Sequence, residues 1–186
     1  MRIIAGSARG RVFEAPKGMD TRPTLDRVRE NVFNILQMKV RGAQVLDLFS
    51  GSGAMAFEAI SRGAERATLV DHDRQAHQIE VQNAQKLRME DACTILHCDW
   101  KQAVQRLSVQ NASFDLIILD PPYAFHDMTD ILTALKPLMK KDAVVLLEHE
   151  AKVFPSVPDG FELYDSRKYG VAGVSFFRLW HSEEES

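Results

Sequence analysis

The sequence predicts an α/β fold in which helices cover a mostly parallel β-sheet. Short apolar runs alternate with stretches of helical periodicity along most of the chain, which is typical of β-α-β units. The last part instead contains two strand-like runs joined by a glycine-containing turn, which predicts an antiparallel pair at one edge of the sheet. A chain of 186 residues, 45% of them hydrophobic, can form one sizeable core. We therefore expect a single domain.

The first 41 residues predict a β-hairpin and an amphipathic helix ahead of the sheet. Residues 2–5 and 11–14 are short strand candidates on either side of a glycine-containing turn. Thr24 can cap a helix whose apolar positions follow the helical period as far as Leu36. This segment is basic, with nine lysines and arginines against four acids, although the whole chain has a net charge of -3. It suits contact with a phosphate backbone; an ordinary solvated face is the alternative.

Basic side chains of this segment are the candidates for contact with a polyanion. Two of them, Arg27 and Arg29, lie near the start of the predicted helix, where the helix dipole disfavours cations and favours an anionic ligand. The residues expected to contact RNA are Arg2, Arg9, Arg11, Lys17, Arg22, Arg27 and Arg29.

A glycine turn follows the first predicted strand of the core. The run 45–56, VLDLFSGSGAMA, contains Gly51, Gly53 and Ala56 in the pattern G-x-G-x-x-A and leads into a predicted helix. Asp71 lies twenty positions after Gly51, at the end of the next strand candidate. This spacing is typical of a nucleotide-binding loop whose acidic residue accepts hydrogen bonds from ribose hydroxyls. A simple tight turn between strand and helix is the alternative.

Asp47 decides between two kinds of cofactor. A carboxylate at the mouth of the glycine turn would repel a pyrophosphate, which argues against a nicotinamide dinucleotide, but it would attract the ammonium and sulfonium of S-adenosyl-L-methionine. After the third strand candidate, 93–97, Asp99 can accept from an adenine amino group, or it can cap the helix that follows. The residues expected to contact the cofactor are Asp47, Phe49, Gly51, Gly53, Asp71, His72, Cys98, Asp99 and Trp100.

The four residues Asp120, Pro121, Pro122 and Tyr123 follow the apolar strand candidate 114–119. Ligands of parallel sheets bind beyond the carboxyl ends of the strands, so these residues fall where chemistry is expected. Prolines supply no N–H, which leaves carbonyl groups free to accept hydrogen bonds beside the carboxylate and the aromatic ring. The group predicts a site for a planar amine or amide; a strand-ending turn is the alternative.

The remaining elements complete the predicted alternation. Nothing in the sequence resembles a signal peptide or a membrane span, and the two cysteines and six histidines lack metal-site spacing, so we expect a cytoplasmic protein that binds no metal. We also expect a monomer. The other predicted helices are 73–88, 100–107 and 127–135, and the other predicted strands are 143–148, 161–169 and 174–180.

These motifs resemble those of the class I, seven-stranded S-adenosylmethionine-dependent methyltransferases. More specifically, RIIAG at 2–6, TRPT at 21–24 and LDLFSGSG at 46–53 are similar to the RsmD family of bacterial small-subunit ribosomal RNA guanine-N2 methyltransferases. The resemblance extends over nearly the whole chain and implies a Rossmann-like fold with an N-terminal β-hairpin extension. It implies methylation of one guanine amine in 16S rRNA, with the assembled 30S subunit as substrate. Residues 1–41 would contact RNA, 42–182 would form the catalytic core and 183–186 an acidic tail.

Other activities would use a similar site. An adenine-N6 methyltransferase acting on DNA or RNA and a protein glutamine-N5 methyltransferase both act on a planar nitrogen, but neither explains the basic N-terminal segment so simply. The short connections also leave little room for a segment that reads DNA bases in the major groove. An RNA-binding or assembly protein with a vestigial cofactor pocket is the non-enzymatic alternative, and the intact Asp120 and glycine turn argue against it.

Overall fold

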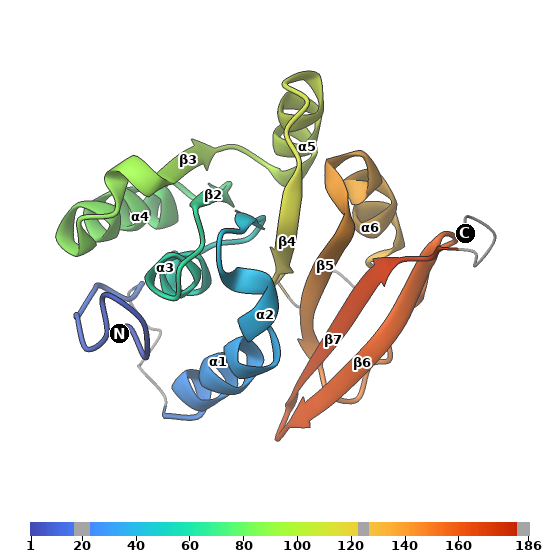
Figure 1. Cartoon of the computed structure of the whole chain (residues 1–186), viewed down its shortest axis with the longest axis horizontal. Coiled ribbons are helices and arrows are strands. Elements are labelled where there is room, and N and C mark those ends of the chain that lie inside the picture. Colours follow the sequence, from blue (N-terminus) through green and yellow to red (C-terminus); the bar gives the residue numbers. More distant parts are fainter. Residues whose placement is uncertain (17–22, 123–126, 182–186) are drawn as a thin grey trace.

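The strands form one sheet with a reversal of strand order near its middle (Figure 1). The computed structural model describes residues 1–16, 23–122 and 127–181. Within these ranges the seven-stranded order is β3-β2-β1-β4-β5-β7-β6. The first five strands in this order are parallel, and β7 is antiparallel to both β5 and β6. The strands are β1 Gln44–Asp47, β2 Arg66–Asp71, β3 Cys93–His97, β4 Phe114–Leu119, β5 Met139–Glu150, β6 Phe161–Tyr169 and β7 Ala172–Leu179. This arrangement confirms the predicted mostly parallel sheet with its antiparallel C-terminal hairpin.

Helices cover both faces of the sheet. Buried residues of α1 to α4 belong to one apolar cluster and those of α5 and α6 to another. The helices are α1 Pro23–Ile35, α2 Gln37–Val40, α3 Ala54–Ser61, α4 Arg74–Leu87, α5 Trp100–Val109 and α6 Thr129–Leu135, with short 3₁₀ turns at Glu90–Ala92 and Lys136–Leu138. None of the helices described is both long and apolar enough to cross a membrane.

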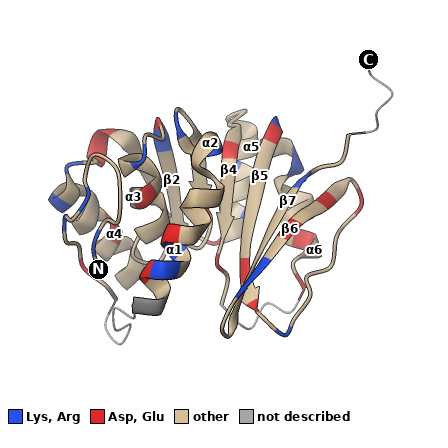
Figure 2. Cartoon of the chain, turned by 60° about the horizontal axis from the view of Figure 1, so that its bottom comes forward, with Lys and Arg blue, Asp and Glu red and all other residues tan. Residues whose placement is uncertain are grey.

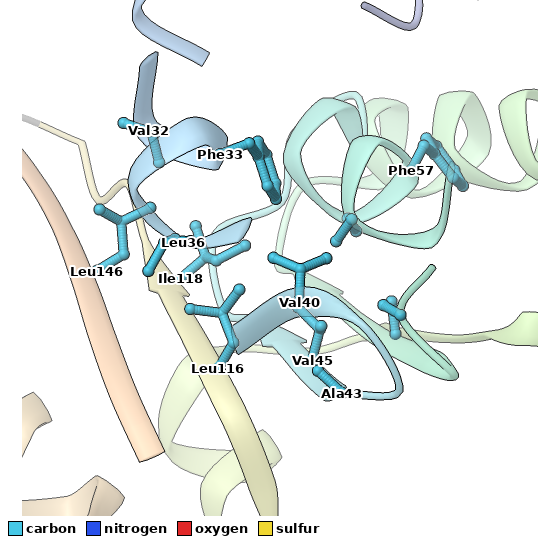
Figure 3. Close-up of a cluster of buried hydrophobic side chains, with 14 of the residues drawn as sticks. Val32, Phe33, Leu36, Val40, Ala43, Val45, Phe57, Leu116, Ile118 and Leu146 are labelled. Carbon is cyan, nitrogen blue, oxygen red and sulfur yellow. The ribbon is translucent and has the colours of Figure 1, made fainter. Parts of the chain in front are cut away.

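Alternation along the central strands divides the core into its two clusters. In β4, Leu116 and Ile118 face one way while Ile117 and Leu119 face the other, because successive strand residues point to opposite faces. Figure 3 shows Val32, Phe33 and Leu36 from the region of α1 packed near Val45, Leu116, Ile118 and Leu146. The segment before the sheet is therefore part of the core as well as a candidate binding surface.

The predicted N-terminal β-hairpin does not form. Within residues 1–16 the pairing is limited to one antiparallel bridge, between Arg2 and Val12, with backbone hydrogen bonds from Ile3 to Arg11, from Gly10 to Ile3 and from Phe13 to Met1 beside it. It does not extend into a ladder because the amides of Ile4 and Ala5 donate instead to the carboxylate of Glu58 on α3, at 2.9 and 3.0 Å. The N-terminal segment consequently lies against α3 (Figure 1) and forms no independent hairpin.

Close backbone contact strengthens this attachment. The amide of Ser7 donates to the carbonyl of Ser61 at 2.7 Å, and the Ser61 hydroxyl donates to the carbonyl of Ala5 at 2.6 Å. Gly6 has a φ of +87°, and a Cβ atom there would lie 1.8 Å from the Ser61 carbonyl oxygen. Only glycine fits this approach without displacing the backbone. The docking of the RIIAG segment onto α3 is therefore a structural reason for this part of the sequence.

Candidate active site

The glycine turn between β1 and α3 is held in a conformation that requires glycine. The amide of Gly53 donates to the carbonyl of Ser50 at 2.7 Å, and Gly53 has a φ of +81°. A Cβ atom at this position would lie 2.3 Å from the ring of Phe57 and 2.8 Å from the Leu69 side chain. The close packing of helix on strand leaves the backbone of the turn accessible to a ligand at the carboxyl end of the sheet.

Asp71, at the end of β2, fastens the glycine turn to the neighbouring strand. Its Oδ2 accepts the amide of Gly51 at 2.9 Å and its Oδ1 accepts the amide of Asp73 at 2.9 Å. Each carboxylate oxygen has a second lone pair, so the group can still accept from ribose hydroxyls. His72 lies beside it, with Nδ1 3.7 Å from Oδ1, and its side chain is 70% exposed.

Asp47, at the end of β1, is only 2% exposed. Burial, followed by the negative charges of Glu80 and Asp71, raises its pKa well above the usual range, while backbone hydrogen bonds from Ala56 and Phe49 lower it. A cation bound nearby would favour the ionised carboxylate. The end of β1 therefore carries an acidic group that a bound cation would stabilise in its ionised form.

The loop after β3 adds the third acid. Asp99 accepts the amide of Gln102 at 3.0 Å and so caps α5, and its side chain is exposed, which leaves the other oxygen free for a ligand. The amide of Cys98 donates to the carbonyl of Asp71 at 3.1 Å, tying the two loops together. Trp100 begins α5 and packs against the core. Burial raises the pKa of the Cys98 thiol, which makes it a poor nucleophile.

Asp120 follows β4 at the same edge of the sheet. Asp120 is itself exposed at the surface. The protein atoms around its carboxyl still desolvate it in part and raise its pKa, and the charges of Glu148 and Asp47 add to the effect. Pro121 is half-buried and Pro122 is exposed, so the backbone here borders solvent. Tyr123, the last residue of the predicted group, lies outside the described residues.

The register of the sheet brings these groups to the point where strand order reverses. Asp47 is paired with Ile118 across β1 and β4, so Asp120 lies two residues beyond the level of Asp47 on the adjacent strand. In open α/β sheets, ligands bind in the crevice at such a reversal. The glycine turn and Asp71 lie on one side of the reversal and Asp120 lies on the other. One ligand could bind on each side, with the two in contact at the reversal.

Comparison with known proteins identifies the family. The family described as "Conserved hypothetical protein 95" matches residues 1–178. The chain belongs to this family. It is also similar to "Putative rRNA methyltransferase YlbH" of Bacillus subtilis, with 33% identity over 96% of this chain and 98% of the relative. Ribosomal RNA small subunit methyltransferase D of Escherichia coli is 32% identical over 100% of this chain and 91% of its own length. These relatives confirm the resemblance inferred from the motifs.

A solved structure of the same kind matches the whole fold. "Putative methyltransferase yhhF" from Escherichia coli has a TM-score of 0.83 and 28% identity, and the match covers 98% of this chain and 99% of that one. The sheet of the present protein, with its antiparallel C-terminal strands, is thus the methyltransferase fold of its family.

The structure adds two acids that the motifs did not reveal. Glu148, near the end of β5, lies beside Asp120 on the adjacent strand, as the pairing of Leu119 with Leu147 requires. Glu80, on α4, is fully buried beneath the glycine turn, where it is hydrogen-bonded to Ser50. Neither belongs to a local motif, and only the register of β5 and the packing of α4 place them at the site.

Burial raises the pKa of Glu80 from 4.5 to about 8, and the charge of Asp71 adds to the increase. The Ser50 hydroxyl donates to this carboxyl, which opposes part of the increase in pKa, and it also lies 2.9 Å from the carbonyl oxygen of Val70. The other oxygen of Glu80, Oε2, has no hydrogen-bond partner among the described residues.

Replacing this carboxyl with an amide should change how stability depends on pH. Between about pH 4.5 and 8 the folded protein binds one proton more than the unfolded chain, so its stability falls as pH rises through this range. We expect Glu80→Gln to remove this loss, with an advantage over wild type that grows to a few kcal/mol near pH 8. Urea unfolding at a series of pH values measures it, with exposed Glu90→Gln as the control. Parallel curves for Glu80→Gln and wild type would contradict the assignment.

The predicted RNA-contacting residues divide into exposed and internal groups. Arg2, Arg9 and Arg27 are exposed, and Arg2 and Arg27 border a surface cavity between the N-terminal segment and α1. Figure 2 shows basic and acidic residues side by side on α1. Lys17 and Arg22 lie outside the described residues, as does the acidic tail 183–186.

Arg11 and Arg29 are occupied within the protein. The guanidinium of Arg29 is 5% exposed and donates to the carbonyl of Arg2 at 2.7 Å and to Asp26 at 3.0 Å. Arg29 therefore does not present its charge to RNA, contrary to the prediction, because it joins α1 to the N-terminal segment. Arg11 is exposed, but its Nη1 donates to the carbonyl of Leu87 at 3.0 Å, at the end of α4. In the described ranges no group of three His, Cys, Asp or Glu could hold a metal ion.

Proposed function

We propose that the protein uses S-adenosyl-L-methionine to methylate the exocyclic N2 amine of a guanine in small-subunit (16S) ribosomal RNA, on the assembled 30S subunit. The observation that carries the proposal is the position of Asp120 and Pro121 at the strand-order reversal, beside the glycine turn and Asp71. The activity combines a cofactor site on β1 to β3 with an acceptor for a planar amine at the end of β4.

The residues present fit this cofactor. Asp47 supplies negative charge where the ammonium of the methionine part would lie, and Asp71 has lone pairs for the ribose hydroxyls. Asp99 keeps one exposed oxygen for the adenine amine, with Phe49, His72, Cys98 and Trp100 from the neighbouring loops around it. The cofactor supplies an electrophilic methyl group on a sulfonium. A pyrophosphate would instead meet the buried carboxylate of Asp47, which disfavours a dinucleotide.

Asp120 and Pro121 orient the amine in this proposal. A guanine amine is a weak nucleophile because its lone pair is delocalised into the ring. The Asp120 carboxylate accepts one N–H and the Pro121 carbonyl the other, and the nitrogen lone pair is aimed at the methyl carbon. After the transfer the nitrogen is strongly acidic, and a carboxylate with a raised pKa can take its proton. Tyr123 would stack on a base turned out of the RNA.

Two features favour a guanine of RNA as the substrate over adenine in DNA or glutamine in a protein. The relatives described above are named for ribosomal RNA, one of them for the small subunit. Exposed Arg2, Arg9 and Arg27 lie on the N-terminal segment and α1 and offer positive charge for phosphates. Adenine-N6 and glutamine-N5 methylation remain the competing assignments, because the end of β4 would hold either nitrogen.

A single labelling experiment tests the assignment. The protein is incubated with S-adenosylmethionine carrying a labelled methyl group and, separately, with undermethylated small subunits, naked rRNA, DNA or total protein. Digestion of the labelled product then identifies the modified nucleoside or amino acid. We expect N2-methylguanosine from the small subunits. Label in N6-methyladenine or in glutamine would reject the proposal.

Charge reversal tests the RNA surface separately. Arg9→Glu combined with Arg27→Glu should weaken RNA binding and make it less dependent on salt, by about 0.7 to 0.9 in the slope of log K against log salt for each phosphate that is no longer neutralised. The Kd for the cofactor should not change. Exposed Arg66→Glu, at the start of β2 and outside both the N-terminal segment and α1, is the control for a change of charge elsewhere on the surface. RNA binding equal to that of wild type would make these arginines part of a solvated face.

A further inference from the structure

Glu148 and Asp120 form a pair of acids on adjacent strands. Leu119 is paired with Leu147 across β4 and β5, so the next residue of each strand lies at the same level. They also share a face of the sheet, since Ile118 and Leu146, two positions earlier, both belong to the cluster beneath α1. The two carboxyl groups therefore lie side by side at the carboxyl end of the sheet.

At the opposite ends of the same two strands, the acidic side chain is paired with hydrogen-bond donors. There Asp115 of β4 accepts from Lys140 of β5 at 2.7 Å and from the amide of Gln44 at 2.8 Å. In contrast, the carboxylates of Asp120 and Glu148 receive no hydrogen bond and form no ion pair within the part of the chain described. Two adjacent like charges are unfavourable unless donors are brought to them. The raised pKa of each carboxyl agrees with this absence of donors.

We propose that Glu148 determines base specificity by accepting the N1–H of guanine while Asp120 accepts from the N2 amine. This inference rests on the proposed function. Guanine presents N1–H and N2–H as neighbouring donors on one edge, whereas adenine presents an N1 lone pair next to its amine. Adjacent strands are about 4.8 Å apart, so carboxylates on neighbouring strands can converge on one base edge. An adenine would direct its N1 lone pair at the Glu148 carboxylate and be rejected.

2-Aminopurine is the substrate that tests this contact. It keeps the N2 amine, has an N1 lone pair in place of N1–H and lacks the O6 carbonyl, so the N1 contact is isolated by comparing wild type with a Glu148 variant. Once labelling has located the target guanine, small-subunit RNA carrying 2-aminopurine at that position can be prepared by ligation and assembled into subunits. The measured quantity is kcat/KM for guanine divided by kcat/KM for 2-aminopurine. For wild type we expect a ratio of at least about 100, because the Glu148 acceptor would face a lone pair instead of a donor.

Glu148→Gln should change this ratio with little change in shape. Its amide can donate to the N1 lone pair of 2-aminopurine, so the ratio should fall at least about ten-fold, with a loss on guanine and a relative gain on 2-aminopurine. Glu150→Gln, an exposed acid two residues further along β5, is the matched control and should keep the wild-type ratio. Cofactor affinity and the unfolding midpoint of each variant show whether the fold is preserved.

Each outcome decides a different question. A ratio in Glu148→Gln equal to that of wild type would overturn the role of Glu148 while leaving guanine methylation intact. If Glu148→Gln does not fold, wild type alone still tests the idea, since equal methylation of 2-aminopurine and guanine would overturn it. Absence of guanine methylation by wild type would reject the proposed function, and this inference with it.

Discussion

Asp120→Asn is expected to lower kcat by about a hundred- to a thousand-fold while leaving the affinity for S-adenosylmethionine nearly unchanged. The variant keeps one oxygen that can accept an N–H but replaces the other with an NH2 donor and removes the negative charge, so the amine is less polarised and less well oriented for attack. The pKa of Asp120 is raised by desolvation and by the charge of Glu148, and the amide also cannot take the proton released after transfer. Single-turnover methylation and calorimetric cofactor titration measure the two effects separately.

Asp115→Asn is the matched control for this experiment. It makes the same chemical change on the same strand, at the end distant from the site, and asparagine can still accept the amide hydrogen bond of Gln44. We expect its kcat to remain within about three-fold of wild type. Turnover by Asp120→Asn at the wild-type rate would show that another group orients the amine.

Glu58→Ala is expected to produce the largest loss of stability, about 3 to 5 kcal/mol. Glu58 is fully buried on α3, accepts the amides of Ile4 and Ala5, and forms an ion pair with Arg62 at 2.8 Å. Removing the carboxylate leaves two backbone donors and the Arg62 guanidinium without their partner, and it removes the negative charge 3.8 Å from Arg29. Urea unfolding measures the loss of free energy.

Hydrogen exchange shows where this loss originates. The amides of Ile4, Ala5 and Ala8 should exchange much faster in Glu58→Ala, because the N-terminal segment is detached before the sheet unfolds. Exposed Glu65→Gln is the control and should change stability by less than about 1 kcal/mol. A small loss in Glu58→Ala with unchanged exchange would mean that the segment is held by its apolar contacts alone.

Local sequence patterns were sufficient to predict the parallel strands of the sheet. The strands Cys93–His97 and Phe114–Leu119 have the predicted bounds, because each is a short run rich in apolar or β-branched residues and ended by a turn. The glycine turn and Asp71 were equally accessible to sequence reasoning, since their roles depend on spacing within one β-α-β unit.

Long-range contacts account for what could not be predicted. Residues 2–5 are predicted to be a short strand, but the amides of Ile4 and Ala5 donate to a carboxylate on α3 that is more than fifty residues away in the chain. Arginine is usually found at the protein surface, but the side chain of Arg29 is buried because the N-terminal segment docks onto α1 and α3. Glu148 becomes significant only once β5 is in register with β4, and no local pattern in β5 indicates that register.

The reversal of strand order also governs the sequence of assembly during synthesis. β1 obtains one neighbour from β2 soon after it is made, but its other neighbour, β4, is translated only after β2, β3 and three helices. Until then the nascent chain exposes an unpaired strand edge and the apolar faces that α1 and α2 will share with β4 and β5. The crevice that we assign to catalysis therefore forms only when β4 pairs with β1, and the edge of β1 stays open to incorrect pairing while β2 and β3 are made.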